Sequence, residues 1–278
     1  MTAGIERRKR RDEHGGTVLS RSPVLAIETT GRTLSVAWSR GNASDGERGG
    51  EIVCRRSESE LNHLTYLIPT VKDILESEGA ALSSLGAVAV SAGPGSFTGA
   101  RIGVSAARAL AQVTGLPVIK VPTLETFVYG YEPGDIVCPV LDARRGQIYS
   151  GAYRLSNDGG SIETLVPGAA RDPEVFDAML DAALAAERER GGREGASFRA
   201  PRGNAEEPYP RVRERSAAIR RVRDEDEPQS AAKVLKWALA FGAPVDYTEL
   251  EPLYLRKAEA QRKLDERRQA EQQNPGKR

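Results

Sequence analysis

The order of hydrophobic patterns is the feature that most constrains how this chain can fold. Three short apolar runs of strand character come first, at residues 24–27, 34–38 and 52–55. From Leu61 the apolar residues recur instead at steps of three and four, which predicts an amphipathic helix that ends near Gly79. The chain therefore begins with strands and then changes to a helical period.

Strands and helices alternate after this first helix. Residues 87–90 predict a buried strand, residues 99–114 a second helix and residues 117–121 another strand. Thr123 is expected to cap a short helix that runs to Tyr129. Three strands followed by this alternation indicate a mixed sheet covered by helices, which is an α/β architecture.

A second unit is predicted from about residue 134. Runs at 136–141 and 147–153 indicate two strands, 163–166 a third, and 173–186 a helix. Because this half also opens with strands, the pattern resembles a duplicated fold whose second copy is degenerate. We therefore predict an N-terminal domain over 23–132 and a C-terminal domain over 133–256.

The remaining segments are mostly charged. Residues 187–229 are rich in Arg, Glu, Gly and Pro, and we interpret them as loop or disorder with one strand at most. A helix face returns at residues 231–239, and 251–256 form an extended patch. Tails are expected at both ends: a disordered basic tail over 1–22 and a charged tail over 257–278.

Composition excludes several classes of function. The formal net charge of the 278 residues is only +1, so strong autonomous binding to nucleic acid is not expected, and a weak RNA contact by the basic tail is the alternative to a solvated tail. Cys54 and Cys138 are too few for a disulfide framework and predict two small buried residues in a reducing cytosol. No apolar run approaches the roughly 20 residues that span a bilayer.

A glycine-rich segment over residues 91–103 joins a predicted buried strand to a predicted helix. Gly93 and Gly95 permit backbone conformations closed to other residues, and Ser96 or Thr98 can cap the helix. A helix start of this kind can bind an anion, but it can also simply allow close packing. The Gly-Lys-Ser/Thr ending of a Walker A loop is absent from the sequence.

A stripe of small residues favours the packing interpretation. Gly99, Gly103, Ala107 and Ala111 recur at every fourth position, so one side of the helix can approach a neighbouring backbone closely. An adjoining apolar face consists of Ile102, Ala106, Leu110 and Val113. The turn therefore suits the start of a closely packed helix better than a phosphate cradle.

The heptapeptide Gly-Pro-Gly-Ser-Phe-Thr-Gly at 93–99, followed by Ala-Arg-Ile-Gly-Val, resembles the hallmark of the TsaB (YeaZ) family. Other segments resemble the family in the same order along the chain, namely 25–30, 117–125, 141–149 and 251–259. The resemblance covers roughly residues 23–260, and 187–229 are unmatched.

The resemblance implies the actin/sugar-kinase/Hsp70-like (ASKHA) fold, with two related mixed-sheet α/β domains. It also implies a non-catalytic, cytoplasmic scaffold or activator subunit that pairs with a TsaD-type catalytic subunit, joined by a TsaE-type ATPase. That complex makes threonylcarbamoyladenosine (t6A) at N6 of adenosine 37 in tRNAs that read ANN codons. On this basis we expect no cofactor of its own, ATP and a metal in the partner subunits, tRNA contact only through the complex, a homodimer when alone and no membrane association.

Several residues agree with a passive role. The only two histidines, His14 and His63, cannot form the i, i+4 pair of a helical metal site, so we predict no metal and no catalytic residue. His63 is expected to be a partly exposed residue in the first helical turn. Glu28 stands where the family usually has Asp, and its extra methylene weakens the alternative of an ATP-binding phosphotransferase or ATPase of this fold.

The glycine-rich segment and the family resemblance together predict two sets of site residues. A weak nucleotide or phosphate loop would consist of Glu28, Thr29, Thr30, Gly93, Gly95, Ser96 and Thr98. In the family the first two helices pack against the partner, which predicts an interface at Leu61, Leu64, Leu67, Ile68, Val71, Leu75, Gly103, Ala107 and Leu110.

Overall fold

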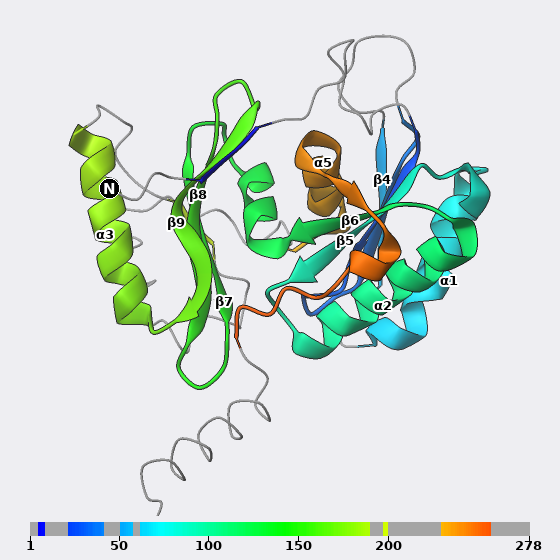
Figure 1. Cartoon of the computed structure of the whole chain (residues 1–278), viewed down its shortest axis with the longest axis horizontal. Coiled ribbons are helices and arrows are strands. Elements are labelled where there is room, and N and C mark those ends of the chain that lie inside the picture. The colour runs from blue at the N-terminus through cyan, green and yellow to red at the C-terminus, as the bar shows by residue number, and fades with distance from the viewer. Residues whose placement is uncertain are drawn as a thin grey trace, which may run out of the picture.

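The computed structural model describes residues 5–8, 22–41, 51–57, 62–189, 197–199 and 229–256, and within them the chain forms two β-sheets with helices packed on them (Figure 1). The six-stranded sheet has the order β11-β6-β5-β2-β3-β4. Its strands are β2 (Val24–Glu28), β3 (Ser35–Ser39), β4 (Ile52–Arg56), β5 (Ala87–Gly93), β6 (Val118–Pro122) and β11 (Pro244–Val245). β2, β5 and β6 are parallel, whereas β3, β4 and β11 are antiparallel to their neighbours.

Helices cover both faces of this sheet. α1 (His63–Ser77) and α2 (Phe97–Thr114) lie on one face and α5 (Ala231–Phe241) on the other (Figure 1). Alternate residues of β2 point to the two layers, with Leu25 in the core of α1 and α2 and Val24 in the core of α5. Every residue of β2, β3 and β5 is buried, as expected for strands covered on both sides.

The five-stranded sheet has the order β1-β9-β8-β7-β10. Its centre is an antiparallel meander of β7 (Ile136–Asp142), β8 (Ile148–Leu155) and β9 (Ser161–Arg171). β1 (Ile5–Arg8) pairs with β9, and β10 (Ser197–Arg199) runs parallel to β7. α3 (Pro173–Glu189) covers one face through Phe176 and Leu180.

One hydrophobic core joins the two sheets. The 3-10 helix η2 (Thr123–Gly130) contributes Phe127 and α5 contributes Trp237, and both pack in the same cluster as Val137 and Tyr153 of the second sheet. The Trp237 indole N–H donates a hydrogen bond of 3.1 Å to Glu125 Oε2 within this core. Short 3-10 turns, η1 (Leu82–Ser84) and η3 (Tyr247–Glu249), complete the described elements.

The mixed α/β architecture predicted from the sequence is confirmed. None of the helices in the described part of the chain is both long and apolar enough to cross a bilayer.

The last part of the expected C-terminal domain of 133–256 belongs instead to the six-stranded sheet of the N-terminal half. α5 and β11 pack on the six-stranded sheet, because the apolar face of α5 fills the side of β2 and β3 that α1 and α2 leave uncovered. Two further expectations change at single elements. Residues 5–8 of the predicted disordered tail form a strand, and Cys54 is exposed whereas Cys138 is buried. The predictions for 9–21, for 200–228 and for the tail at 257–278 lie outside the described residues.

Candidate functional site

The glycine-rich turn lies at the carboxyl end of β5, where that strand passes into α2. Gly93 has a φ of 111°, a left-handed conformation that other residues rarely adopt. Ser96 is the N-cap of α2, and its hydroxyl oxygen accepts a hydrogen bond of 3.1 Å from the backbone N–H of Gly99. Ser96, and not Thr98, therefore caps the helix, and Thr98 is exposed in the first turn.

The first turn of α2 is pressed against the loop that follows β2. A Cβ on Gly99 would lie 1.9 Å from the Thr29 carbonyl oxygen, and one on Gly95 would lie 2.7 Å from Thr30. Thr29 Oγ1 donates a hydrogen bond of 2.8 Å to the Gly99 carbonyl, and the Ser96 N–H donates one of 2.8 Å to the Thr30 carbonyl. Backbone contact at this junction requires glycine at position 99, since no side chain fits there.

Glu28 is fully buried at the end of β2. Its Oε1 accepts hydrogen bonds from the Thr30 N–H, at 2.5 Å, and from the Thr30 hydroxyl, at 2.6 Å. Among the described residues, Oε2 has no donor at hydrogen-bonding distance. Burial raises the pKa of Glu28 above its ordinary value, and the hydrogen bonds from Thr30 oppose that shift only in part.

Two side chains from distant parts of the sequence close the loop after β2. Gln229 Nε2 donates a hydrogen bond of 2.7 Å to Thr30 Oγ1, and the amide of Gln229 lies against Gly31. His63 Nε2 lies 3.0 Å from the Gly31 carbonyl oxygen. The expectation of a partly exposed His63 is wrong, because this contact keeps the ring 5% exposed at the base of α1.

The residues predicted as a phosphate loop do come together, with the exception of the exposed Thr98. Their polar groups bond mainly to one another and to the Ser91–Thr123 hydroxyl pair, whose oxygens are 2.6 Å apart. We call this set the polar junction; it consists of Glu28, Thr29, Thr30, Ser91, Gly93, Gly95, Ser96, Thr123 and Gln229. No residue pattern pointed to Gln229, since it lies at the end of the irregular stretch. No cluster of three or more metal-ligating side chains occurs within the described residues.

The predicted partner interface divides between the core and the surface. Leu67, Val71, Leu75, Gly103 and Ala107 are buried in the chain's own core, because these are the positions of α1 and α2 that face the sheet. Leu64 and Ile68 are 78% and 53% exposed, and Leu110 is half-buried. Leu61 lies outside the described residues. The helical pattern located the helices but did not separate the inward from the outward positions.

Residues 251–256 form a strap that crosses the glycine-rich turn, and its contacts were not predicted. The Leu253 N–H donates a hydrogen bond of 2.7 Å to the Ala92 carbonyl, and the Leu253 carbonyl lies where a Cβ on Gly93 would point. Further along, Arg256 donates hydrogen bonds to the carbonyl oxygens of Ala143 and Arg144 in the β7–β8 hairpin. The strap thus connects the turn of the first sheet to a hairpin of the second (Figure 1).

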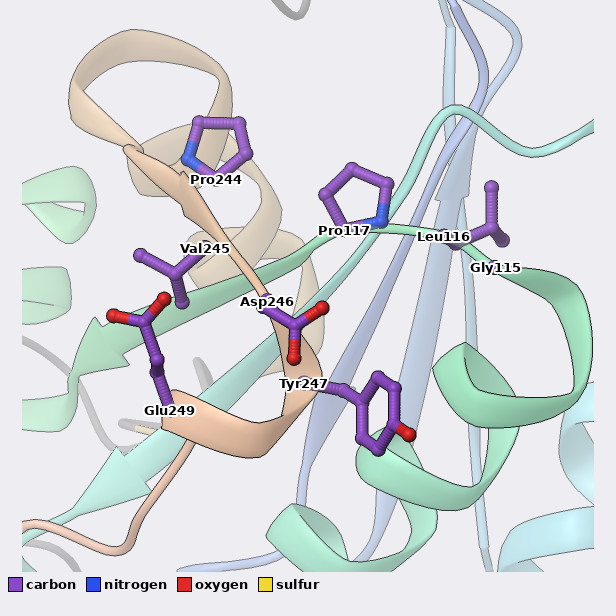
Figure 2. A pocket seen from close by; sticks show the side chains of 8 residues that line it. All are labelled: Gly115, Leu116, Pro117, Pro244, Val245, Asp246, Tyr247 and Glu249. Atoms are coloured by element: carbon purple, nitrogen blue, oxygen red, sulfur yellow. The ribbon is translucent and has the colours of Figure 1, made fainter.

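An open cavity of about 470 Å³ lies at the other end of α2 (Figure 2). Its two carboxylates are Asp246 and Glu249, and hydrogen bonds from Thr248 lower the pKa of Asp246. The cavity is separated from the polar junction by the length of the helix. Its lining residues are Gly115, Leu116, Pro117, Pro244, Val245, Asp246, Tyr247 and Glu249.

Comparison with known proteins gives a consistent result. The family model described as "TsaD: tRNA N6-adenosine threonylcarbamoyltransferase" matches residues 56–265. The chain is 35% identical over 145 residues to the tRNA threonylcarbamoyladenosine biosynthesis protein TsaB of Bacillus subtilis, covering 52% of this chain and 59% of that protein. It is 36% identical over 140 residues to TsaB of Escherichia coli, covering 49% and 57%, so it spans under two thirds of the length of both. For TsaB of Buchnera aphidicola, at 32% identity, the shares are 51% and 68%.

Two solved structures from Pseudomonas aeruginosa have the same fold. One is described as an uncharacterized protein with similarity to peptidase YEAZ, and it matches with a TM-score of 0.59 at 25% identity over 84% of this chain and all of that one. The other is YeaZ, with a TM-score of 0.58 at 24% identity over 84% and 99%. The ASKHA-like fold of two mixed-sheet halves agrees with both comparisons.

Proposed function

This chain belongs to the family of the matching model, TsaD: tRNA N6-adenosine threonylcarbamoyltransferase, and to its TsaB (YeaZ) relatives; from that premise we propose that it is a non-catalytic subunit for t6A biosynthesis. In this proposal it pairs with a TsaD-type catalytic subunit, which transfers threonylcarbamoyl to N6 of adenosine 37 in tRNAs that read ANN codons. A TsaE-type ATPase joins the pair.

The observation that carries the proposal is the outer side of α1. Leu64 and Ile68 are four residues apart and therefore lie on the same side of the helix, with 78% and 53% of each side chain in solvent. The inward residues of α1, such as Leu67 and Val71, already satisfy the contact with the sheet. Exposed large aliphatic residues arranged in a row on a well-packed helix are typical of a surface that binds another protein.

The polar junction supports a subunit without turnover of its own. Glu28 Oε1 is occupied by Thr30, and the Thr30 hydroxyl in turn is held by Gln229. Burial raises the pKa of Glu28, and a hydrated magnesium ion would have to compete with the two hydrogen bonds from Thr30 that its Oε1 already accepts. The alternative of an ATP-binding phosphotransferase or ATPase therefore gains no support from the contacts at this junction.

The remaining parts of the proposal concern the assembly. We assign ATP and metal to the partner subunits, and we place the complex in the cytoplasm. Without its partner this chain would form a homodimer through the same exposed side of α1. The basis for these assignments is the resemblance of residues 93–99 and the segments around them to the TsaB family.

A charge placed on α1 tests the pairing. In the double variant Leu64→Asp/Ile68→Asp, we expect the affinity for the TsaD-type subunit to fall at least about 100-fold, because two carboxylates would have to be desolvated in the contact. Both positions are exposed, so the melting temperature should change by no more than about 2 °C. Analytical ultracentrifugation or calorimetry of the purified pair measures the affinity.

Val175→Asp is the matched control. Val175 is a 50% exposed apolar residue in the first turn of α3, on the second sheet, so the same kind of substitution there should leave pairing intact. Loss of t6A from bacterial cells depleted of their own TsaB, and its return with the wild-type chain but not with the α1 variant, would establish the role. Undiminished pairing of the α1 variant, or failure of the wild-type chain to restore t6A, would refute it.

A further inference from the structure

An aromatic–arginine cluster lies on the surface where α2 begins. It consists of Phe97 in the first turn of α2, Arg101 one turn later and Tyr254 on the strap. The ring centroids of Phe97 and Tyr254 are 5.1 Å apart. The Arg101 guanidinium lies 4.0 Å from the Phe97 ring centroid, and its Nε donates a hydrogen bond of 2.9 Å to the Tyr254 hydroxyl.

The cluster is ordered but not covered. Phe97 and Tyr254 are 43% and 45% exposed, and Arg101 is also exposed. The strap does not need these rings to reach the turn, since the Leu253 N–H is already bonded to the Ala92 carbonyl. Two aromatic rings thus remain at the surface of a protein in which only 5% of residues are aromatic. The exposed ring surface would suit a ligand with a planar apolar face.

Positive charge continues from this cluster along the strap. Arg256 lies two residues beyond Tyr254 and holds the tip of the β7–β8 hairpin. At that tip Arg144 and Arg145 have φ values of 67° and 57°, and the Arg144 side chain is 85% exposed. Asp142 is an acidic partner at the tip, with its carboxylate 3.2 Å from Arg144, and Glu251 is exposed at the start of the strap.

We propose that the aromatic–arginine cluster and the hairpin arginines form a contact surface for an unpaired segment of RNA. A base stacks on the exposed parts of Phe97 and Tyr254, while Arg101, Arg144 and Arg145 bind neighbouring phosphates. This inference rests on the proposed function, which makes tRNA the substrate of the assembly, and it assigns part of the RNA contact to this subunit.

Chemistry favours RNA over a protein at this surface. Stacking on aromatic side chains and on guanidinium planes is the usual way in which proteins hold unpaired bases, and it tolerates many sequences. A row of arginines suits the regular spacing of phosphates. The net charge of +1 limits this to a local contact that adds to RNA binding by the whole complex.

Fluorescence anisotropy tests the proposal with the complex of this chain and its TsaD-type subunit. The probes are a labelled anticodon stem–loop and free AMP. For Phe97→Leu and for Tyr254→Leu, the dissociation constant of the stem–loop should rise about 5-fold or more, the lower end of what one stacked base contributes. Arg101→Ala should weaken binding similarly, and it should reduce the slope of log affinity against log salt by about 0.7.

Two further variants separate charge from folding. Arg144→Gly/Arg145→Gly removes both charges while glycine keeps the left-handed backbone without strain, and it should reduce the salt slope by about 1.4. Arg188→Ala is the control, because it removes one exposed arginine from the far end of α3 and should change neither quantity. The melting temperature and the affinity for the catalytic subunit are measured for every variant.

The outcomes are distinct. Weaker stem–loop binding with intact pairing supports the proposal. Unchanged stem–loop affinity in both the Phe97 and the Arg101 variants would overturn it while leaving the proposed function standing. Loss of pairing in these variants, or binding of AMP but not of the stem–loop, would also overturn it, since the surface would then serve a protein or a free nucleotide.

Discussion

The two sheets of this protein are built from similar parts but are covered differently. The six-stranded sheet has helices on both faces, and β2, β3 and β5 are buried along their whole length. Among the described helices, α3 covers one face of the five-stranded sheet, and residues of β9 alternate between buried and half-buried over the first part of the strand. Its other face contributes to the core that it shares with η2 and α5.

The difference also extends to connectivity. The centre of the second sheet is a meander of three consecutive strands, so its contacts are local in sequence. The first sheet combines parallel crossovers with β11, which returns from more than a hundred residues away to pair with β6. The polar junction and the exposed residues Leu64 and Ile68 of α1 both belong to the first sheet and its helices. We infer that the surface proposed to bind the partner subunit lies on the first sheet, whereas the arginines proposed to contact RNA extend onto the β7–β8 hairpin of the second.

The largest expected effect comes from truncating one fully buried aromatic residue in each region, which tests whether the two sheets open independently. Phe127→Ala removes a ring from the core shared by both sheets, and Phe176→Ala removes one from the core under α3. Each should lower the free energy of unfolding by about 3–5 kcal/mol. Hydrogen exchange should speed up in both sheets for Phe127→Ala, but only in α3 and β7–β9 for Phe176→Ala.

Urea denaturation gives the stability of these two variants, and amide exchange followed by mass spectrometry locates the effect. If Phe176→Ala also accelerated exchange in β2 and β5, the two regions would open as one unit and the comparison would fail.

The contact between α2 and the loop after β2 gives the next largest effect. Gly99→Ala would place a methyl group 1.9 Å from the Thr29 carbonyl oxygen. Because this oxygen belongs to the backbone, it cannot rotate away from the methyl group as a flexible side chain could. We expect a loss of about 3 kcal/mol in the free energy of unfolding. Gly115→Ala at the opposite end of α2 meets nothing within 4 Å and has a φ of 71°, so it should lose only about 1 kcal/mol. Equal losses in the two variants would contradict the close packing at Gly99.

The smallest effect concerns Glu28 and depends on pH. Because burial raises the folded-state pKa, the stability linked to this proton is present below the ordinary pKa of about 4.5 and is lost as the pH rises toward the raised value. Glu28→Gln cannot lose that proton. Relative to wild type, the variant should therefore become more stable as the pH is raised from 4 to 8, as measured by urea denaturation across that range. A difference that is constant with pH would show that Glu28 titrates normally.

Much of the local structure was predictable from residue patterns. The change from strand to helical period near Leu61 correctly placed α1, and the small-apolar run at 87–90 placed β5. The single strand allowed within the irregular stretch is observed as β10. These features depend on neighbouring residues, so the sequence alone contains their cause.

Features that depend on distant contacts were not predictable. The apolar face of α5 was recognised, but nothing in its pattern distinguishes which of two sheets it covers. Leu67 and Leu64 lie three residues apart and are equally apolar, yet one is buried against the sheet and the other is exposed. Gln229 was missed because its bond to Thr30 joins residues 199 positions apart.

The placement of α5 has a consequence for synthesis on the ribosome. Strands β2, β3 and β5 leave the exit tunnel well before the helix that covers one of their faces, because α5 begins only at Ala231. Until then the apolar side formed by Val24, Ala26 and Ala37 has no cover, and it is a surface that chaperones recognise. A nonsense codon before Gln229 would leave that surface permanently open, so a truncation that removes α5 should yield aggregated protein.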